Sequence, residues 1–483
     1  MSMLPVFAAL GLFGGSWCFA KCAGRLDSGL HILIVILLFG GILGVNLGSG
    51  AYPIMFRDAF VVLPLYLGLF SGPAGQKALA RVPIDILGIL CLLLAAILLC
   101  LFSPEEAATM QILIGLKVWL YYIPFLVVGI ALAADRDRML GFFRQFLFWG
   151  CAACGVGLVQ SFLVRIVGYE RTIGWFFGIH AAAVTQGFGF FNVVGGIYRV
   201  PGTFSFVSQY IAFLHFFLTV AVIEANVDPE PRIRRIAGAA VFLAVVAAVL
   251  SGGREAIIFV PAMLLFYVSA GLLNVRFLLI IPIGGALSLA FIKASGLDLI
   301  SYFFYANAIA LEYAQGWLWD QIASGLNHGL LGAGIGSSTG PARYGTTGVA
   351  GGFSDTVVGL GLESYFAKAA AELGWVGFAV IALLMTTIAI RSIGSILSSW
   401  THREKLVVTP LAIYLLYNVV MSFKGFVLDT DPGNIMIWIS FGLMVGLARL
   451  GERARDPFMP TFGEEFVGGL NGTLRGPGRH QST

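Results

Sequence analysis

The chain has 483 residues, of which 58% are hydrophobic and 11% are charged, and its mean hydropathy is +0.91. Soluble globular proteins carry roughly 25% charged residues, so this composition excludes a soluble globular fold. The formal net charge of +4 is small, and the positions of the basic residues are therefore more informative than their sum.

Apolar runs long enough to cross a lipid bilayer recur along the chain. A hydrocarbon core about 30 Å thick requires roughly 20 apolar residues per helix. About thirteen such runs are expected, near residues 3–20, 30–49, 59–72, 82–102, 109–133, 140–165, 205–225, 236–251, 255–272, 276–293, 364–390, 406–423 and 434–450. In hydrocarbon a helix satisfies its own backbone hydrogen bonds. The sequence therefore predicts an all-α polytopic membrane protein of about 12–14 transmembrane helices, in a single domain over residues 1–450.

The basic residues predict the orientation, because short cytoplasmic loops carry an excess of Lys and Arg. Alternate loops and the segment after the last span hold a large set of them: Lys21, Arg25, Lys77, Arg81, Arg136, Arg138, Arg232, Arg234, Arg235, Arg276, Arg391, Arg403, Lys405, Arg449, Arg453 and Arg455. An intervening loop, Ser103–Ala108, has two Glu and no base. We therefore expect the basic loops to be cytoplasmic, together with a disordered tail at 451–483 that is rich in Gly, Arg and Pro.

Two long stretches without a span then fall on the outer side, which is the periplasm of a Gram-negative cell. They cover about 167–204 and about 294–361, and the second is rich in Gly, Ser, Thr, Trp and Tyr. Structureless loops of this length are uncommon in compact domains unless they are functional. We therefore expect the functional residues near these two periplasmic loops, at the outer ends of the spans.

The first motif joins the first outer loop to a span. It reads Tyr198-Arg199 followed by Val-Pro-Gly-Thr-Phe-Ser. Arg199 is suited to binding an anion from the outer side. The alternative interpretation is that a single interfacial Arg extends its charged end to water. The Pro-Gly turn followed by Thr and Ser favours a shaped junction.

The second motif is a very short outer turn, Ser251-Gly-Gly-Arg254-Glu255. Free backbone N–H groups, the positive end of a helix and a guanidinium would converge there on an anion. We therefore predict phosphate binding at Arg254. The alternative is a tight hairpin with a surface pair between Arg254 and Glu255.

The third motif is a glycine-rich series in the second loop, Asn327-His328-Gly-Leu-Leu-Gly-Ala-Gly-Ile-Gly-Ser, followed by Arg343 and Tyr344. It is not a phosphate-binding P-loop, because it lacks Gly-Lys-Ser/Thr. His328 is a catalytic candidate, and the alternative interpretation is a single exposed loop His.

The fourth motif runs from the second loop into a span, as Glu363-Ser364-Tyr365 followed by Lys368 and Glu372. The last two residues are four apart and share a helix face, so they are candidates for a simple ion pair. Glu363 lies nearest the water-facing mouth and is a general-base candidate if burial raises its pKa. The alternative is stabilisation of the first helical turn.

Other charges are weaker candidates. Lys117 lies inside a span and suggests helix association or a lipid contact, and Arg57-Asp58 is expected to form an ion pair. The two long outer stretches contain no Asp-x-Asp motif and no cluster of His and carboxylates. We therefore predict neither a metal site nor a cofactor.

The order of these motifs resembles the O-antigen ligase and O-antigen/exopolysaccharide polymerase superfamily. It comprises an Arg before Gly-Thr-Phe-Ser, then Ser-Gly-Gly-Arg, then Asn-x-Gly-Leu-x-Gly-x-Gly, then Ser-Tyr-x-x-x-x-x-Glu-Leu-Gly-x-x-Gly. The resemblance covers roughly residues 190–390. It implies a membrane glycosyltransferase of GT-C type that uses undecaprenyl-pyrophosphate-linked oligosaccharides as donor and acceptor. It also implies pyrophosphate contacts by Arg199, Arg254 and Arg343.

Ligases of this superfamily typically carry a His, followed by Asn or Ser, before the aromatic residue of the last motif. Here that place holds Glu363-Ser364-Tyr365, which favours a polymerase. The implied reaction is an inverting, metal-independent attack by an acceptor hydroxyl, with Glu363 as base and His328 as the weaker alternative. Residues expected to line the substrate are Tyr198, Ser251, Asn327, Tyr344, Ser364 and Tyr365. The second loop also carries aromatic residues that could stack on sugar rings, namely Tyr313, Trp317, Trp319 and Tyr344. The alternative interpretation of these residues is an aromatic belt at the membrane interface.

Two alternatives remain. A ligase would transfer the lipid-linked glycan to lipid A core or to protein. A polysaccharide or lipid transporter is the candidate from another class, although transporters favour internal repeats and charges at the membrane midplane. The expected partners are the lipid-linked glycans, membrane lipid and a chain-length regulator or export component, and no nucleic acid.

Overall fold

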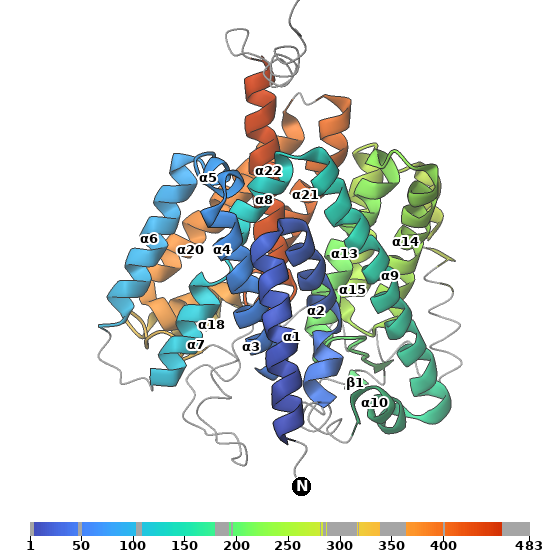
Figure 1. Cartoon of the computed structure of the whole chain (residues 1–483), viewed down its shortest axis with the longest axis horizontal. Helices are drawn as coiled ribbons and strands as arrows, with labels where there is room; N and C mark the ends of the chain where they lie inside the picture. Colours follow the sequence, from blue (N-terminus) through green and yellow to red (C-terminus); the bar gives the residue numbers. More distant parts are fainter. Residues whose placement is uncertain are drawn as a thin grey trace, which may run out of the picture.

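The computed structural model describes residues 4–46, 51–102, 109–178, 193–194, 197–280, 282–283, 286, 316, 318–338, 364–398 and 401–455. Helices account for nearly all of its regular structure (Figure 1). In chain order the elements are α1 (Leu4–Gly24), α2 (Leu26–Asn46), α3 (Ala51–Arg57), the π-helical η1 (Asp58–Val62), α4 (Leu63–Ser71), α5 (Pro73–Leu79), α6 (Ile84–Cys100), α7 (Thr109–Leu120), α8 (Phe125–Ala133), α9 (Arg136–Val167), α10 (Tyr169–Phe177), β1 (Val193–Val194), β2 (Ile197–Tyr198), α13 (Val207–Val227), α14 (Pro231–Leu250), α15 (Arg254–Ser269), the 3₁₀ turn η3 (Val275–Leu279), α18 (Leu318–Leu326), α20 (Tyr365–Leu397), α21 (His402–Met421) and α22 (Gly433–Arg455).

Within the described ranges, nine helical segments are long and apolar enough to cross a membrane, and α5 with α6, bent by 91°, adds a tenth if counted as one span. The prediction of a helical polytopic membrane protein is therefore confirmed. The predicted runs 3–20 and 255–272 form α1 and the shorter α15. Most of the run 276–293 lies outside the described residues.

Small residues allow the central helices to approach closely. A Cβ on Gly129 of α8 would lie 2.3 Å from the carbonyl oxygen of Ile439, and one on Gly442 of α22 would lie 2.1 Å from that of Leu126. Helix pairs in membranes associate through such contacts because lipid supplies no hydrophobic driving force between them. The spanning windows of α13 and α22 are the most buried, at 78% each, which places both in the core of the bundle.

The elements that carry the sequence motifs gather at one end of the bundle. The start of α1, together with α10, β1 and α18, lies at this end, whereas α22 runs to the opposite end (Figure 1). The two-residue strands β1 and β2 pair antiparallel, with Val193 opposite Tyr198. We call this end of the molecule the α10 end.

Candidate functional site

The first and second motifs lie against each other at the α10 end. The backbone N–H of Val200 donates a hydrogen bond to the carbonyl oxygen of Ser251 (3.2 Å). Gln160 of α9 donates to the carbonyl oxygen of Gly202 (2.7 Å), and Ile42 of α2 donates to that of Thr203 (3.0 Å). The segment after Arg199 is therefore held by three separate elements, as expected of a shaped junction.

The Ser251 turn has the local geometry that its sequence requires. Ser251 is fully buried, and its hydroxyl donates to the carbonyl of Ala248 (2.7 Å) and accepts from the N–H of Gly253 (3.1 Å). Gly252 has a φ of +71°, a left-handed conformation that glycine adopts without steric cost. The structure describes the backbone of Arg254, which is the first residue of α15. The predicted position of this arginine at a helix start is confirmed.

The third and fourth motifs form a second docked pair. Ala333 donates its N–H to the carbonyl of Ala371 (2.7 Å), and Trp375 donates to the carbonyl of Gly329 (3.3 Å). The close approach depends on glycine, because a Cβ on Gly332 would lie 2.6 Å from the nitrogen of Gly374, and both glycines have positive φ. The glycine-rich series therefore packs on the first turns of α20.

Glu372 of α20 holds the glycine-rich series against this helix through buried hydrogen bonds. Its carboxylate is fully buried and accepts hydrogen bonds from the N–H groups of Gly336 and Ser338 (3.0 Å each) and from the indole of Trp119 (2.8 Å). Lys368 instead forms a buried ion pair with Asp429 and lies 4.6 Å from the Trp119 ring centroid. The interpretation of Lys368 and Glu372 as a simple pair is therefore not supported, because each has other partners.

The α21–α22 loop, residues 422–432, connects the two docked pairs. The carbonyl of Ser422 accepts from the N–H of Tyr365 (3.0 Å) and from the hydroxyl of Ser364 (3.3 Å). Two residues further along, Lys424 forms an ion pair with Glu255 of α15 (2.8 Å). The loop thus joins the fourth motif to the second, and all four motifs meet at the α10 end.

The same loop holds two buried carboxylates that the sequence analysis did not single out. Asp429 pairs with Lys368, and Asp431 pairs with Arg57 (2.8 Å). Burial raises the pKa of Asp429 from its ordinary value, and the neighbouring Lys368 lowers it only in part. Arg57 also pairs with Asp58 (2.8 Å), as predicted, and Asp58 in turn holds Lys117 of α7. This network ties α3, α7 and the α21–α22 loop together.

A further basic residue, Arg165, lies beside the first two motifs and was missed by the sequence analysis. Its guanidinium donates to the carbonyl of Ser161 (2.7 Å), and the hydroxyl of Ser161 donates to the carbonyl of Leu250 (2.9 Å), immediately before the Ser251 turn. Nearby, the rings of Tyr169 and Tyr198 stack at 5.2 Å. Arg165 lies in the last turn of α9. The sequence around it contains no motif that would mark it as part of an anion site.

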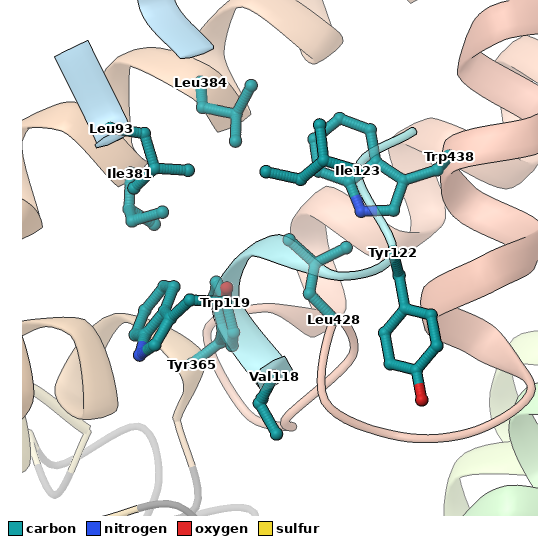
Figure 2. Close-up of a pocket in the computed structure, with 10 residues that line it drawn as sticks. All are labelled: Leu93, Val118, Trp119, Tyr122, Ile123, Tyr365, Ile381, Leu384, Leu428 and Trp438. Atoms are coloured by element: carbon teal, nitrogen blue, oxygen red, sulfur yellow. The ribbon is translucent and has the colours of Figure 1, made fainter. Parts of the chain in front are cut away.

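The structure also contains a small cavity, shown in Figure 2. It is lined by Leu93, Val118, Trp119, Tyr122, Ile123, Tyr365, Ile381, Leu384, Leu428 and Trp438. Its walls come from α6, α7 and the turn after it, α20, α22 and the α21–α22 loop. No arginine motif contributes to it, so this cavity is distinct from the candidate anion site.

Some predicted residues fall outside the described structure, namely Glu363, Arg343 and Tyr344, with Tyr313 and Trp317 of the aromatic set. Asn327 and His328 follow the end of α18, where the N–H of His328 donates to the carbonyl of Gly325 (3.2 Å). Ser364 caps α20 by accepting from the N–H of Ala367 (3.3 Å). Among the residues with described side chains, His328 is therefore the one base candidate from the sequence.

Several basic residues lie on adjoining segments of this arrangement. Over the described ranges, no group of three or more His, Cys, Asp and Glu side chains is arranged to hold a metal ion. The basic residues Arg165, Arg199, Arg254 and Lys424 instead belong to segments that contact one another around the Ser251 turn. Comparisons of the sequence with protein-family models and with curated proteins give no match.

Proposed function

We propose that this chain is a membrane glycosyltransferase that polymerises glycan repeat units carried on undecaprenyl pyrophosphate into a bacterial surface polysaccharide or exopolysaccharide. The proposal rests on the resemblance to the O-antigen ligase and polymerase superfamily, whose fold is of GT-C type. The contacts among the four motifs support it, since they bring motifs from residues 198–377 together at one end of the bundle.

One observation carries the proposal, the hydrogen bond from Val200 to the carbonyl of Ser251. It links the segment of Arg199 to the turn that precedes Arg254, across about fifty residues of sequence. Two guanidinium groups on adjoining segments are suited to a diphosphate, because Arg donates several hydrogen bonds to phosphate oxygens in a fixed planar geometry.

The proposed reaction needs little from the protein beyond binding and one proton transfer. An acceptor hydroxyl attacks the anomeric carbon of the donor sugar, the bond from that carbon to the pyrophosphate oxygen breaks, and the configuration inverts. Arg199 and Arg254, with Arg343, offset the charge that develops on the leaving diphosphate. Glu363 takes the proton of the acceptor hydroxyl, with His328 as the alternative base.

The proposal places the chain in the bacterial inner membrane with the α10 end facing the periplasm and the C-terminus in the cytoplasm. The basic residues at the opposite end support this orientation, because cytoplasmic loops are enriched in Lys and Arg. The stretches 167–204 and 294–361 would then be periplasmic loops beside the site. The bilayer would deliver the lipid-linked substrate laterally.

The direct test is turnover by the purified full-length protein in nanodiscs. The substrate is a polyprenyl-pyrophosphate-linked repeat unit, and the product is detected by mass spectrometry. The proposal predicts products of two or more repeat units on one lipid, together with free polyprenyl pyrophosphate. Transfer only to added lipid A core or to protein would instead support the ligase, and no consumption of the donor with either acceptor would contradict both.

A further inference from the structure

Glu224 lies in the last turn of α13. This turn is opposite the α10 end, because α14 follows it and runs back to the Ser251 turn. The Glu224 side chain is fully buried, and neither of its carboxyl oxygens accepts a hydrogen bond from a donor in the described part of the chain. An ionised carboxylate without a donor is very costly away from water, and the partial negative charge at the C-terminal end of a helix disfavours it further. The surroundings of Glu224 therefore oppose a negative charge on this residue.

The neighbouring carboxyl group, Asp228 at the C-terminal cap of α13, is buried as well but has several donors. The guanidinium of Arg144 donates to both of its oxygens, and the backbone N–H of Glu230 donates to one of them (2.7 Å). Asp228 also forms a side-chain hydrogen bond with Glu224. A hydrogen bond between two carboxyl groups requires a proton on one of them. Because Asp228 already accepts from three donors, the proton lies on Glu224.

The helices around α13 supply one cation to this place. α13 packs against α9, α14, α15, α21 and α22, and among the described residues the charged groups that act on Glu224 are Asp228 and Arg144. The Arg144 guanidinium is shared between Asp228 and Glu230 (3.0 Å). From α15, the Tyr267 hydroxyl is hydrogen-bonded to Thr219 (2.9 Å), more than one helical turn before Glu224. The basic side chains at the starts of α14 and α21 and near the end of α22 are exposed, namely Arg232, Arg234, Arg235, Lys405 and Arg449.

We infer that Glu224 is a proton-binding site, whose protonated carboxyl group donates a hydrogen bond to the Asp228 carboxylate that Arg144 holds. A proton suits this place better than a metal ion, because a metal ion needs several oxygen ligands. Loss of the proton would place two buried negative charges beside one guanidinium, so the contact between α9 and the α13–α14 loop would weaken as the pH rises. The site lies at the end of the bundle opposite the candidate anion site and does not rest on the proposed function.

The test is infrared difference spectroscopy of the purified full-length protein in nanodiscs at neutral pH. The wild type is expected to show the C=O stretching band of a protonated carboxyl group, and Glu224→Gln is expected to remove it. The matched control is Glu372→Gln, because the Glu372 carboxylate is also fully buried but accepts hydrogen bonds from Gly336, Ser338 and Trp119. This control is expected to leave the band unchanged. A wild-type spectrum without such a band, or an unchanged band in Glu224→Gln, would overturn the inference.

A second variant tests the acceptor of the proposed hydrogen bond. Asp228→Asn replaces a carboxylate by an amide, whose carbonyl oxygen is a weaker acceptor for the Glu224 O–H. The carboxyl band is therefore expected to remain in Asp228→Asn but to shift in frequency. A band at the wild-type frequency would show that Glu224 does not donate to Asp228, and this result would overturn the assignment of the pair.

The pH dependence of stability gives an independent measurement of the same proton. An unfolded Glu is ionised at neutral pH, so folding of the wild type takes up a proton that Glu224→Gln does not require. In reversible denaturation, the wild type is expected to lose stability relative to Glu224→Gln as the pH rises through neutrality, with a difference in slope of about one proton. Parallel pH profiles of the two proteins would contradict the inference. Stability that depends on sodium or potassium, without a carboxyl band, would assign the pair to a metal cation and overturn it.

Discussion

Replacement of Glu372 by Gln changes one atom of a buried carboxylate and is expected to destabilise the protein. The native group accepts from three donors, with Gly336 and Trp119 on one oxygen and Ser338 on the other. Glutamine offers one carbonyl oxygen and one –NH₂ group. If its oxygen faces the first two donors, its amide faces the N–H of Ser338, so one hydrogen bond is lost and two donors oppose each other.

A buried donor left without an acceptor costs about 1–3 kcal/mol, so we expect a loss of about 2 kcal/mol for Glu372→Gln. Glu372→Ala leaves three donors unsatisfied and is expected to cost more. The loss is measured by reversible denaturation in detergent, together with hydrogen exchange of residues 327–338, which should accelerate as the segment leaves α20. The matched control is Glu404→Gln in the exposed capping box with Thr401, where water replaces the lost bond. Wild-type stability and unchanged exchange in Glu372→Gln would refute the reasoning.

Three further outcomes are expected. Asp429→Ala leaves the buried Lys368 unpaired and should cost about 3–5 kcal/mol, whereas the same change combined with Lys368→Met should restore much of the loss in the same denaturation assay. Burial raises the pKa of Asp228, but hydrogen bonds from Arg144, Glu224 and the backbone of Glu230, with the charge of Arg144, together lower this pKa below its ordinary value. A lowered carboxyl pKa stabilises the fold at pH values above the pKa of the unfolded state, and this stability disappears as the pH falls through the pKa of the folded state. The melting temperatures of the wild type and Asp228→Asn should therefore differ at pH 7 and converge below about pH 4. Glu363→Gln is expected to bind the donor without turnover, and full turnover would remove Glu363 as the base.

The transmembrane body was predictable because its signal is local. A run of about 20 apolar residues encodes a span without reference to any other part of the chain. The exceptions are informative, since α15 has only 16 residues and α5 meets α6 at a 91° bend. Composition alone does not encode such a bend, because neighbouring helices set the direction of each segment.

The contacts of the site were less predictable because they depend on tertiary structure. Arg199 and Arg254 could be singled out from the sequence, because each is a charged residue beside a turn at the end of a predicted span. Lys424 carried none, because its partner Glu255 lies 169 residues away. Spacing suggested a pair between Lys368 and Glu372, but the helix face they share meets different neighbours, and tertiary contacts with Asp429 and Trp119 prevail over an i,i+4 interaction worth only a few tenths of a kcal/mol.

The central claim, that the arginine-bearing motifs of the α10 end serve glycan polymerisation, is tested most directly by the size profile of surface glycans. A strain lacking the chain is complemented with the wild type, Arg254→Ala or Arg391→Ala at matched membrane levels. The account predicts long chains with the wild type and Arg391→Ala, and single unpolymerised repeat units with Arg254→Ala. A normal ladder of chain lengths in the Arg254→Ala strain would contradict it.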